Sequence, residues 1–150
     1  MWIPEEIENY CIDHSTRPGL VAQELEAHTR QEVHGSNMLI GEMEGAVLKF
    51  LLKINQAKTV VEFGTFTGYS ALVMAEALPQ DGKLYTVDIN PDTTKLARSY
   101  WDRSDVGHKI IQILKPGLEA LEQLNDKYDL IFIDADKRNY PQYLQWATEH

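Results

Sequence analysis

Apolar residues recur at helical spacing in the first third of the chain. Residues 4–16 and 19–34 are polar with scattered apolar positions, and they predict two short helices separated at Pro18-Gly19. Residues 42–55 have a clearer pattern, which predicts a helix with one apolar stripe. The side chains of this stripe are Met43, Ala46, Val47, Phe50, Leu51 and Ile54.

After residue 58, short apolar and β-branched runs alternate with helical segments. The predicted strands are 59–63, 84–88, 109–114 and 129–134. The predicted helices are 70–78, with Ser70 as a candidate cap, 91–103, 118–124 and 140–150. Strands that alternate with helices predict an α/β fold, a parallel sheet with helices on both faces. In such folds ligands bind beyond the carboxyl ends of the strands, so polar residues at those ends are candidate site residues.

Length, charge and cysteine content limit the kinds of protein to which this chain can belong. A chain of 150 residues with 43% hydrophobic residues can form a single domain with a buried core. A formal net charge of -9 argues against broad binding to nucleic-acid phosphates. Cys11, the one cysteine, cannot form an internal disulfide, which fits a reducing, cytoplasmic compartment. No signal peptide or membrane span is expected, because no apolar run approaches the roughly 20 residues that cross a bilayer.

The segment between Gly64 and Gly68 predicts a tight turn from a strand into a helix. Glycine allows the backbone to approach a ligand closely, and the free N–H groups in the first turn of the helix favour an anion. Glu62 would repel a pyrophosphate and attract an ammonium group. An amino-acid-like ligand carries an ammonium and a carboxylate, so the turn fits the methionine part of S-adenosylmethionine better than a dinucleotide. The alternative is a glycine turn that serves packing alone.

Asp88 ends the second predicted strand and lies 24 residues after Gly64. An acidic residue about 20 residues beyond a glycine turn commonly accepts hydrogen bonds from the hydroxyl groups of a ribose. Asp88 could instead cap the helix that begins near Pro91, as could Asn90 or Asp92. The glycine turn that precedes it favours ribose binding.

The stretch from Asp129 to Lys137 combines an apolar strand with a charged end. Four consecutive apolar residues, 130–133, predict a strand that is covered on both faces. Asp134 and Asp136 follow, and their oxygens suit Mg²⁺, with Ca²⁺ or Mn²⁺ as alternatives. A bound cation would promote proton loss from a coordinated hydroxyl and from Lys137, which could then act as a general base. Read alone, the stretch fits an ordinary solvated charged loop equally well.

Together these clusters resemble the cation-dependent class I O-methyltransferases, the group that includes caffeoyl-CoA and catechol O-methyltransferases and bacterial relatives. The resemblance rests on the segments 61–70 (VEFGTFTGYS), 87–91 (VDINP) and 132–140 (FIDADKRNY). It implies that residues 38–150 form the cofactor-binding core of a Rossmann-like methyltransferase domain and that residues 1–37 are the family's variable N-terminal helices. The family's sheet continues further, so the chain is expected to be truncated after the fourth strand.

The resemblance also implies a role for individual residues. The cofactor-binding residues would be Glu62, Gly64, Thr65, Ser70, Asp88, Ile89, Gly117 and Asp136. Among them, Ser70 would hold the methionine carboxylate of S-adenosylmethionine, and Asp136 would lie near its amino group. Ile89 and Gly117 would lie beside the adenine.

The reaction and its partners follow from the same resemblance. Asp134 would bind a divalent cation, Mg²⁺ by preference, and Lys137 would be the catalytic base for the acceptor hydroxyl. The remaining metal ligands, an Asp-Asn pair, would follow a fifth strand. The expected enzyme is a homodimer that transfers a methyl group from S-adenosylmethionine to a small hydroxylated acceptor such as a catechol.

Three other functions stay open. The acceptor could be a hydroxylated uridine of tRNA, although the acidic composition disfavours nucleic acid. A truncated chain could bind the cofactor without being active. A nicotinamide-dependent oxidoreductase is disfavoured by Glu62 and by the spacing E-x-G-x-x-x-G, which differs from G-x-G-x-x-G.

Overall fold

A parallel sheet of four strands forms the centre of the molecule. The computed structural model describes residues 3–150, and the strand order is β3-β2-β1-β4. The strands are β1 (Thr59–Phe63), β2 (Lys83–Asp88), β3 (Ile110–Leu114) and β4 (Leu130–Ile133). β1 pairs in parallel with β2 and β4, which places Glu62 beside Thr86 and Phe132. The sheet confirms the α/β fold and the parallel topology expected from the sequence.

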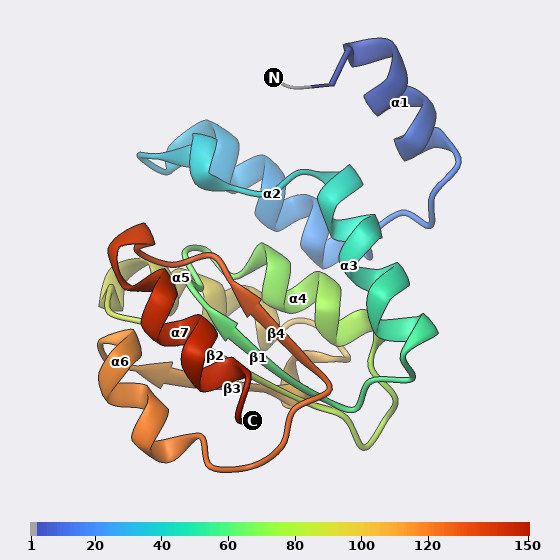
Figure 1. Ribbon diagram of the computed structural model, residues 1–150. Helices are drawn as coiled ribbons and strands as arrows, with labels where there is room; N and C mark the ends of the chain where they lie inside the picture. The colour runs from blue at the N-terminus through green and yellow to red at the C-terminus, as the bar shows by residue number, and fades with distance from the viewer. Residues whose placement is uncertain (1–2) are drawn as a thin grey trace.

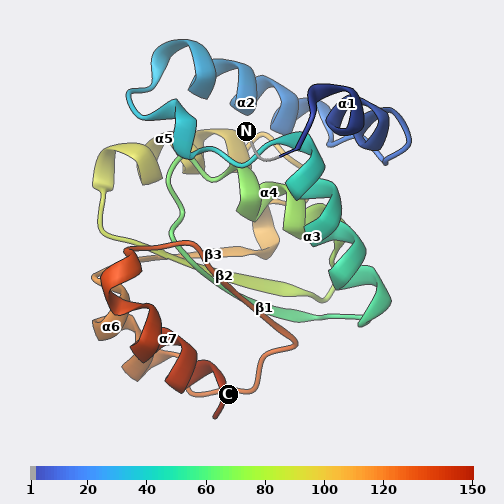
Figure 2. The same ribbon diagram turned by 45° about the horizontal axis from the view of Figure 1, so that its top comes forward.

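Helices cover both faces of the sheet (Figure 1). They are α1 (Glu5–Asp13), α2 (Leu20–Glu32), α3 (Glu42–Ile54), α4 (Tyr69–Ala77), α5 (Pro91–Trp101), α6 (Gly117–Ala120) and α7 (Tyr140–Ala147). Figure 2 shows α3 and α4 on one side of the sheet and α6 and α7 on the other. α5 also packs on the α4 side, α2 lies over α4 and α5, and α1 lies against α3. No helix within residues 3–150 is long and apolar enough to cross a membrane.

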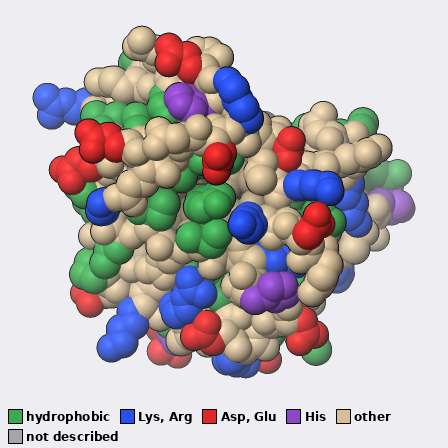
Figure 3. Space-filling model, turned by 90° about the horizontal axis from the view of Figure 1, so that it is seen from below, with side chains coloured by type: hydrophobic (Ala, Val, Ile, Leu, Met, Phe, Trp, Pro, Cys, Tyr) green, Lys and Arg blue, Asp and Glu red, His purple; other side chains and the backbone are tan. Residues whose placement is uncertain are grey.

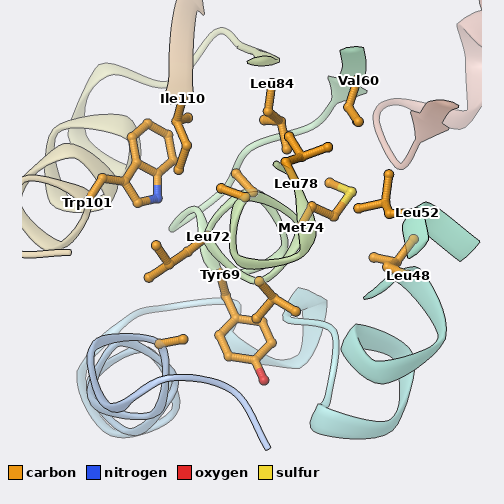
Figure 4. Packing of buried hydrophobic residues seen from close by; sticks show 14 of the residues in the cluster. Leu48, Leu52, Val60, Tyr69, Leu72, Met74, Leu78, Leu84, Trp101 and Ile110 are labelled. Atoms are coloured by element: carbon orange, nitrogen blue, oxygen red, sulfur yellow. The ribbon is translucent and has the colours of Figure 1, made fainter. Parts of the chain in front are cut away.

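Helix α4 is enclosed between the sheet and the outer helices. Its residues 69–75 are all buried, which is typical of a helix that is apolar on every side. In Figure 4, Leu72 points toward Trp101 of α5, and Met74 points toward Leu52 of α3. This packing fixes the start of α4 relative to the end of β1.

The apolar stripe predicted for residues 42–55 does not form the buried face of α3. Its exposed members, at 37–63%, are Val47, Phe50, Leu51 and Ile54. The buried face instead contains Leu48 and Leu52. Gly45 lets α4 approach this face closely, because a methyl group at position 45 would lie 3.2 Å from Val73. The helix is apolar on more than one side, and the contact at Gly45 decides which side is buried.

The start of α4 differs from the prediction that Ser70 caps this helix. The N-cap residue is Gly68, whose backbone is left-handed with φ of 82°. The Trp101 indole donates a hydrogen bond of 2.9 Å to the Gly68 carbonyl, and a side chain at position 68 would collide with the indole ring. Ser70 lies inside the helix and donates to Glu62 instead. The capping prediction is wrong because contact with α5 sets the turn.

Strand β4 forms an edge of the sheet within the described residues. The apolar run predicted a strand whose two faces are both covered by other elements, but all four residues of β4 are only half-buried. An edge strand has one neighbouring strand, and here that neighbour is β1. The apolar run is therefore less covered than a strand in the centre of a sheet would be.

Candidate active site

A pocket of about 690 Å³ opens at the carboxyl ends of the strands. Its wall contains every predicted site residue except Glu62. The predicted residues that line it are Gly64, Thr65, Ser70, Asp88, Ile89, Gly117, Asp134, Asp136 and Lys137. Parallel strands end at the same edge of a sheet, and this topology brings together residues that are far apart in the sequence.

The wall also contains residues that were not predicted as site residues. They are Met38, Leu39, Ile40, Phe63, Phe66, Tyr69, Val87, Asn90, Thr93, Ala135 and Tyr143. Residues 38–40 come from the segment between α2 and α3, far from any strand end in the sequence. Tyr143 comes from α7, where it follows the ordinary apolar spacing of a helix. Nothing in the sequence pattern distinguishes residues 38–40 or Tyr143 from ordinary core residues.

Gly64 brings the turn after β1 against the turn after β4. Its φ is +99°, a conformation that residues with a side chain rarely adopt. A methyl group at position 64 would lie 2.3 Å from the carbonyl oxygen of Asp134. Gly68, by contrast, packs against Trp101 and is not part of the pocket wall. The packing alternative therefore explains Gly68, whereas Gly64 serves packing and also shapes the wall.

Asp88 uses its carboxylate to hold the glycine turn. Oδ2 accepts hydrogen bonds from the N–H groups of Thr65 at 2.9 Å and Phe66 at 2.8 Å. Oδ1 accepts one from the N–H of Asn90 at 2.9 Å. A carboxylate has about four acceptor positions, so about one remains free at the pocket wall. The cap of α5 is Asn90, which accepts from two backbone N–H groups of the first turn.

Glu62 is fully buried beneath the pocket wall. Its carboxylate accepts hydrogen bonds from the hydroxyl of Ser70 and from the hydroxyl of Thr86, the latter at 2.5 Å. Thr86 shares a further hydrogen bond of 2.6 Å with Thr65. Burial raises the pKa of Glu62 to about 7, although the two hydroxyl donors lower it; two nearby carboxylates add to the rise.

Glu62 lies beneath the pocket wall and is not part of it, which differs from the expectation that it lines the site. The hydroxyls of Ser70 and Thr86 occupy both carboxylate oxygens, and a pKa near 7 leaves the group only partly ionised at neutral pH. Repulsion by Glu62 therefore does not argue against a pyrophosphate. The Ser70 proton is engaged by Glu62, and the free N–H groups in the first turn of α4 could accommodate an anion.

We expect Glu62→Gln to change how the stability of the protein depends on pH. Glu62 binds its proton more tightly in the folded protein, with a pKa of about 7, than at the ordinary value of 4.5. Its stabilising contribution is therefore fully present below about pH 4.5 and is lost as pH rises to about 7, a change of roughly 3 kcal/mol. Urea unfolding of both proteins at pH 5 and pH 7.5 measures this. The free energy of unfolding of the variant should rise relative to that of the wild type between pH 5 and pH 7.5. A difference in free energy that stays constant with pH would contradict the expectation.

Asp134, Asp136 and Lys137 follow β4 and line the same pocket. Desolvation and the charge of Glu44 raise the pKa of Asp134, and Lys137 lowers it. Asp136 accepts a hydrogen bond of 3.0 Å from the hydroxyl of Tyr143. Within residues 3–150, no three His, Cys, Asp or Glu side chains gather as a metal-binding group. The described residues therefore offer Asp134 as one candidate ligand and no complete metal site.

Ile89 and Gly117 give the pocket an apolar surface. Ile89 follows β2 and is 67% exposed although it lines the pocket. Gly117 begins α6, and a methyl group there would lie 2.2 Å from the hydroxyl oxygen of Tyr143. An exposed apolar side chain beside a strand end suits a flat ring, so contact with an adenine remains the prediction for this part of the wall.

Known proteins are similar to this chain over most of its length. The family model described as O-methyltransferase matches residues 12–149. "Probable caffeoyl-CoA O-methyltransferase 1" of Dictyostelium discoideum is 33% identical over 148 residues, which cover 95% of this chain and 64% of that protein. Caffeoyl-CoA O-methyltransferase 3 of Nicotiana tabacum is 42% identical over 106 residues, which cover 67% of this chain and 44% of that protein.

Solved structures share the fold. The O-methyltransferase TomG of Streptomyces achromogenes, in complex with S-adenosylmethionine, has a TM-score of 0.88 at 27% identity and covers 96% of this chain, which spans 66% of that one. An O-methyltransferase of Bacillus cereus, in complex with S-adenosylhomocysteine, has a TM-score of 0.82 at 27% identity, with 96% of this chain and 67% of that one covered. The chain spans about two thirds or less of these relatives, and it belongs to the O-methyltransferase family.

Proposed function

We propose that the protein transfers a methyl group from S-adenosylmethionine to the hydroxyl oxygen of a small acceptor such as a catechol. The observation that supports this most is the single pocket at which the glycine turn, Asp88 and residues 134–137 meet. Its volume of about 690 Å³ is in the range of small-molecule sites. Two relatives with the same fold were solved with S-adenosylmethionine or S-adenosylhomocysteine bound.

In this proposal, different wall residues hold the two ends of the methyl donor. Asp88 accepts a hydrogen bond from a ribose hydroxyl at its remaining acceptor position, and Ile89 packs against the adenine. Asp136 pairs with the ammonium group, and the first turn of α4 donates backbone N–H groups to the carboxylate. These contacts hold the sulfonium methyl group beside the acceptor oxygen, and this positioning lowers the barrier to transfer.

Lys137 is the proposed proton acceptor. The acceptor oxygen attacks the methyl carbon in line, a C–O bond forms, the S–CH₃ bond breaks, and S-adenosylhomocysteine leaves. The hydroxyl proton passes to the Nζ atom of Lys137, which must be unprotonated at that moment. Lys137 lies on the pocket wall directly after the two carboxylates of the β4 turn, where an acceptor can reach it.

A divalent cation, with Mg²⁺ favoured, is part of the proposal. The carboxylate oxygens of Asp134 at the pocket wall suit a hard cation, and a bound cation would stabilise the ionised acceptor oxygen. Residues 3–150 contain no group of three such ligands. The cation would act on the acceptor oxygen, whereas Asp88 and Asp136 bind the methyl donor and Lys137 accepts the proton.

A small acceptor is favoured over a tRNA base by the charge of the molecule. The formal net charge is -9. On the face shown in Figure 3, the Lys and Arg side chains lie among Asp and Glu side chains. Binding to nucleic-acid phosphates needs clustered Lys and Arg. We also propose that the protein is a cytoplasmic homodimer, on the basis of composition and family resemblance.

Calorimetric titration of the chain tests the methyl-donor site. S-adenosylmethionine and S-adenosylhomocysteine should both bind, and NAD should bind at least about 100-fold more weakly, a difference of about 2.7 kcal/mol. Each titration is repeated with and without Mg²⁺. Tight binding of NAD with no response to S-adenosylhomocysteine would overturn the proposal in favour of an oxidoreductase.

An assay of methyl transfer separates an enzyme from a module that only binds the cofactor. Labelled S-adenosylmethionine and a catechol should give a methylated product, and a chelator should abolish the transfer until Mg²⁺ is added back. Transfer that persists in the chelator would remove the cation from the proposal. Binding of S-adenosylhomocysteine without any transfer would favour the binding module.

A further inference from the structure

We propose that Tyr143 is a positioning residue, which orients Asp136 toward the ammonium group of the bound methyl donor. This inference rests on the proposed function, because it assumes that the pocket binds S-adenosylmethionine. Tyr143 belongs to α7 and lies outside the three sequence clusters that predicted the site. It lines the pocket although its side chain is only 1% exposed.

Aromatic packing fixes the ring of Tyr143. The ring stacks on Phe63 at the end of β1, with 4.7 Å between the centroids and 20° between the planes. Trp146, from the next turn of α7, meets the same phenylalanine edge-on at 5.6 Å. Gly117 leaves room for the hydroxyl, because a methyl group at that position would lie 2.2 Å from the oxygen. The hydroxyl is therefore held at a defined point of the wall.

The fixed hydroxyl donates a hydrogen bond of 3.0 Å to Oδ1 of Asp136. Burial raises the pKa of Tyr143 to about 12, with a further rise from Asp136, so the hydroxyl remains a donor at neutral pH. Asp136 is itself exposed and belongs to a loop, so its own packing restricts its rotamer little. With Oδ1 engaged, Oδ2 is left to pair with a cationic group in the pocket.

A carboxylate that is already oriented loses less conformational freedom when a ligand binds. Supporting hydrogen bonds of this kind hold binding groups near their productive geometry. The contact between Tyr143 and Asp136 should therefore strengthen binding of the amino-acid end of the methyl donor and leave binding of the nucleoside end unchanged. That asymmetry distinguishes a positioning role from a general contribution to the fold.

Tyr143→Phe tests the inference, since it removes the hydroxyl and keeps the ring. We expect the affinity for S-adenosylhomocysteine to fall about 3- to 10-fold, the effect of one hydrogen bond. The affinity for 5′-methylthioadenosine, which lacks the amino-acid end, should change by less than about twofold. Both ligands are measured on the same preparation, so a partial loss of folded protein would affect them alike. Equal weakening of the two would overturn the positioning role.

Tyr140→Phe is the matched control. Tyr140 is in the first turn of the same helix, but it is not part of the pocket wall, so both affinities should stay unchanged. In an Asp136→Ala background, Tyr143→Phe should cause no further loss of S-adenosylhomocysteine binding, and an additional loss as large as in wild type would contradict the coupling. A wild-type chain that binds neither ligand would overturn the proposed function itself. A wild type that binds both, with equal weakening in the variant, would overturn only the role of Tyr143.

Discussion

Lys137→Ala should lower the rate of methyl transfer by about 10²- to 10⁴-fold, the usual contribution of a general base. Lys137 lines the pocket next to Asp136, and alanine leaves no proton acceptor at that position. The substitution removes none of the contacts proposed for the methyl donor, so the affinity for S-adenosylhomocysteine should change by less than about twofold. Transfer to a catechol and calorimetry with S-adenosylhomocysteine measure the two effects separately.

Arg138→Ala is the control for Lys137→Ala. Arg138 is the next residue, lies in the same turn, carries the same charge and is not part of the pocket wall. Its replacement should leave the rate of transfer nearly unchanged. Equal losses of transfer rate in the two variants would mean that the positive charge of the loop, and not a proton acceptor at position 137, supports the reaction. Full activity in Lys137→Ala would exclude this lysine as the base.

Gly64→Ala should lower the free energy of unfolding by about 2–5 kcal/mol. The new methyl group would adopt an unfavourable backbone conformation at φ of +99° and would lie 2.3 Å from the carbonyl oxygen of Asp134. The first effect costs about 1–2 kcal/mol, and forced overpacking typically costs a further 1–3 kcal/mol. For a chain of this size, the melting temperature should fall by roughly 5–20 °C, which a calorimetric scan measures.

Gly41→Ala provides the comparison for Gly64→Ala. Gly41 precedes α3 with φ of -90°, and a methyl group there would meet its nearest neighbour, on Arg30, at an ordinary 4.0 Å. Its replacement should change the stability by less than about 1 kcal/mol. Similar losses in both variants would mean that the contact between the turns after β1 and β4 is not what position 64 requires. A stable Gly64→Ala protein would mean that the two turns can separate without cost.

Much of the architecture could be predicted because it depends on local properties of the chain. The β-branched run 59–63 forms β1 with the predicted bounds, and the apolar run 130–133 forms β4. Alternation of strands and helices implied a parallel sheet, and in a parallel sheet the residues after each strand must meet at one edge. For this reason Gly64, Asp88 and Asp134, which follow or end three different strands, were expected together and do line one pocket.

The orientation of individual side chains could not be predicted in the same way. The pattern of α3 contained more than one apolar face, and only the close approach of α4 at Gly45 buried Leu48 and left Phe50 exposed. Glu62 was expected in the pocket wall because it stands near a strand end. The hydroxyls of Ser70 and Thr86 instead bind it beneath the wall.

Tyr143 marks the limit of what could be inferred without a three-dimensional structure. The family, the strand ends and the titratable residues of the pocket could all be recognised from short segments, because each depends on neighbours within a few positions of the chain. The contact of Tyr143 with Asp136 and its stacking on Phe63 join α7 to the ends of β4 and β1. Such contacts depend on how helices pack against a finished sheet, and no periodicity along the chain encodes that packing. Local sequence therefore determined the framework and the composition of the site, and tertiary packing decided which side chains line the pocket and which lie beneath its wall.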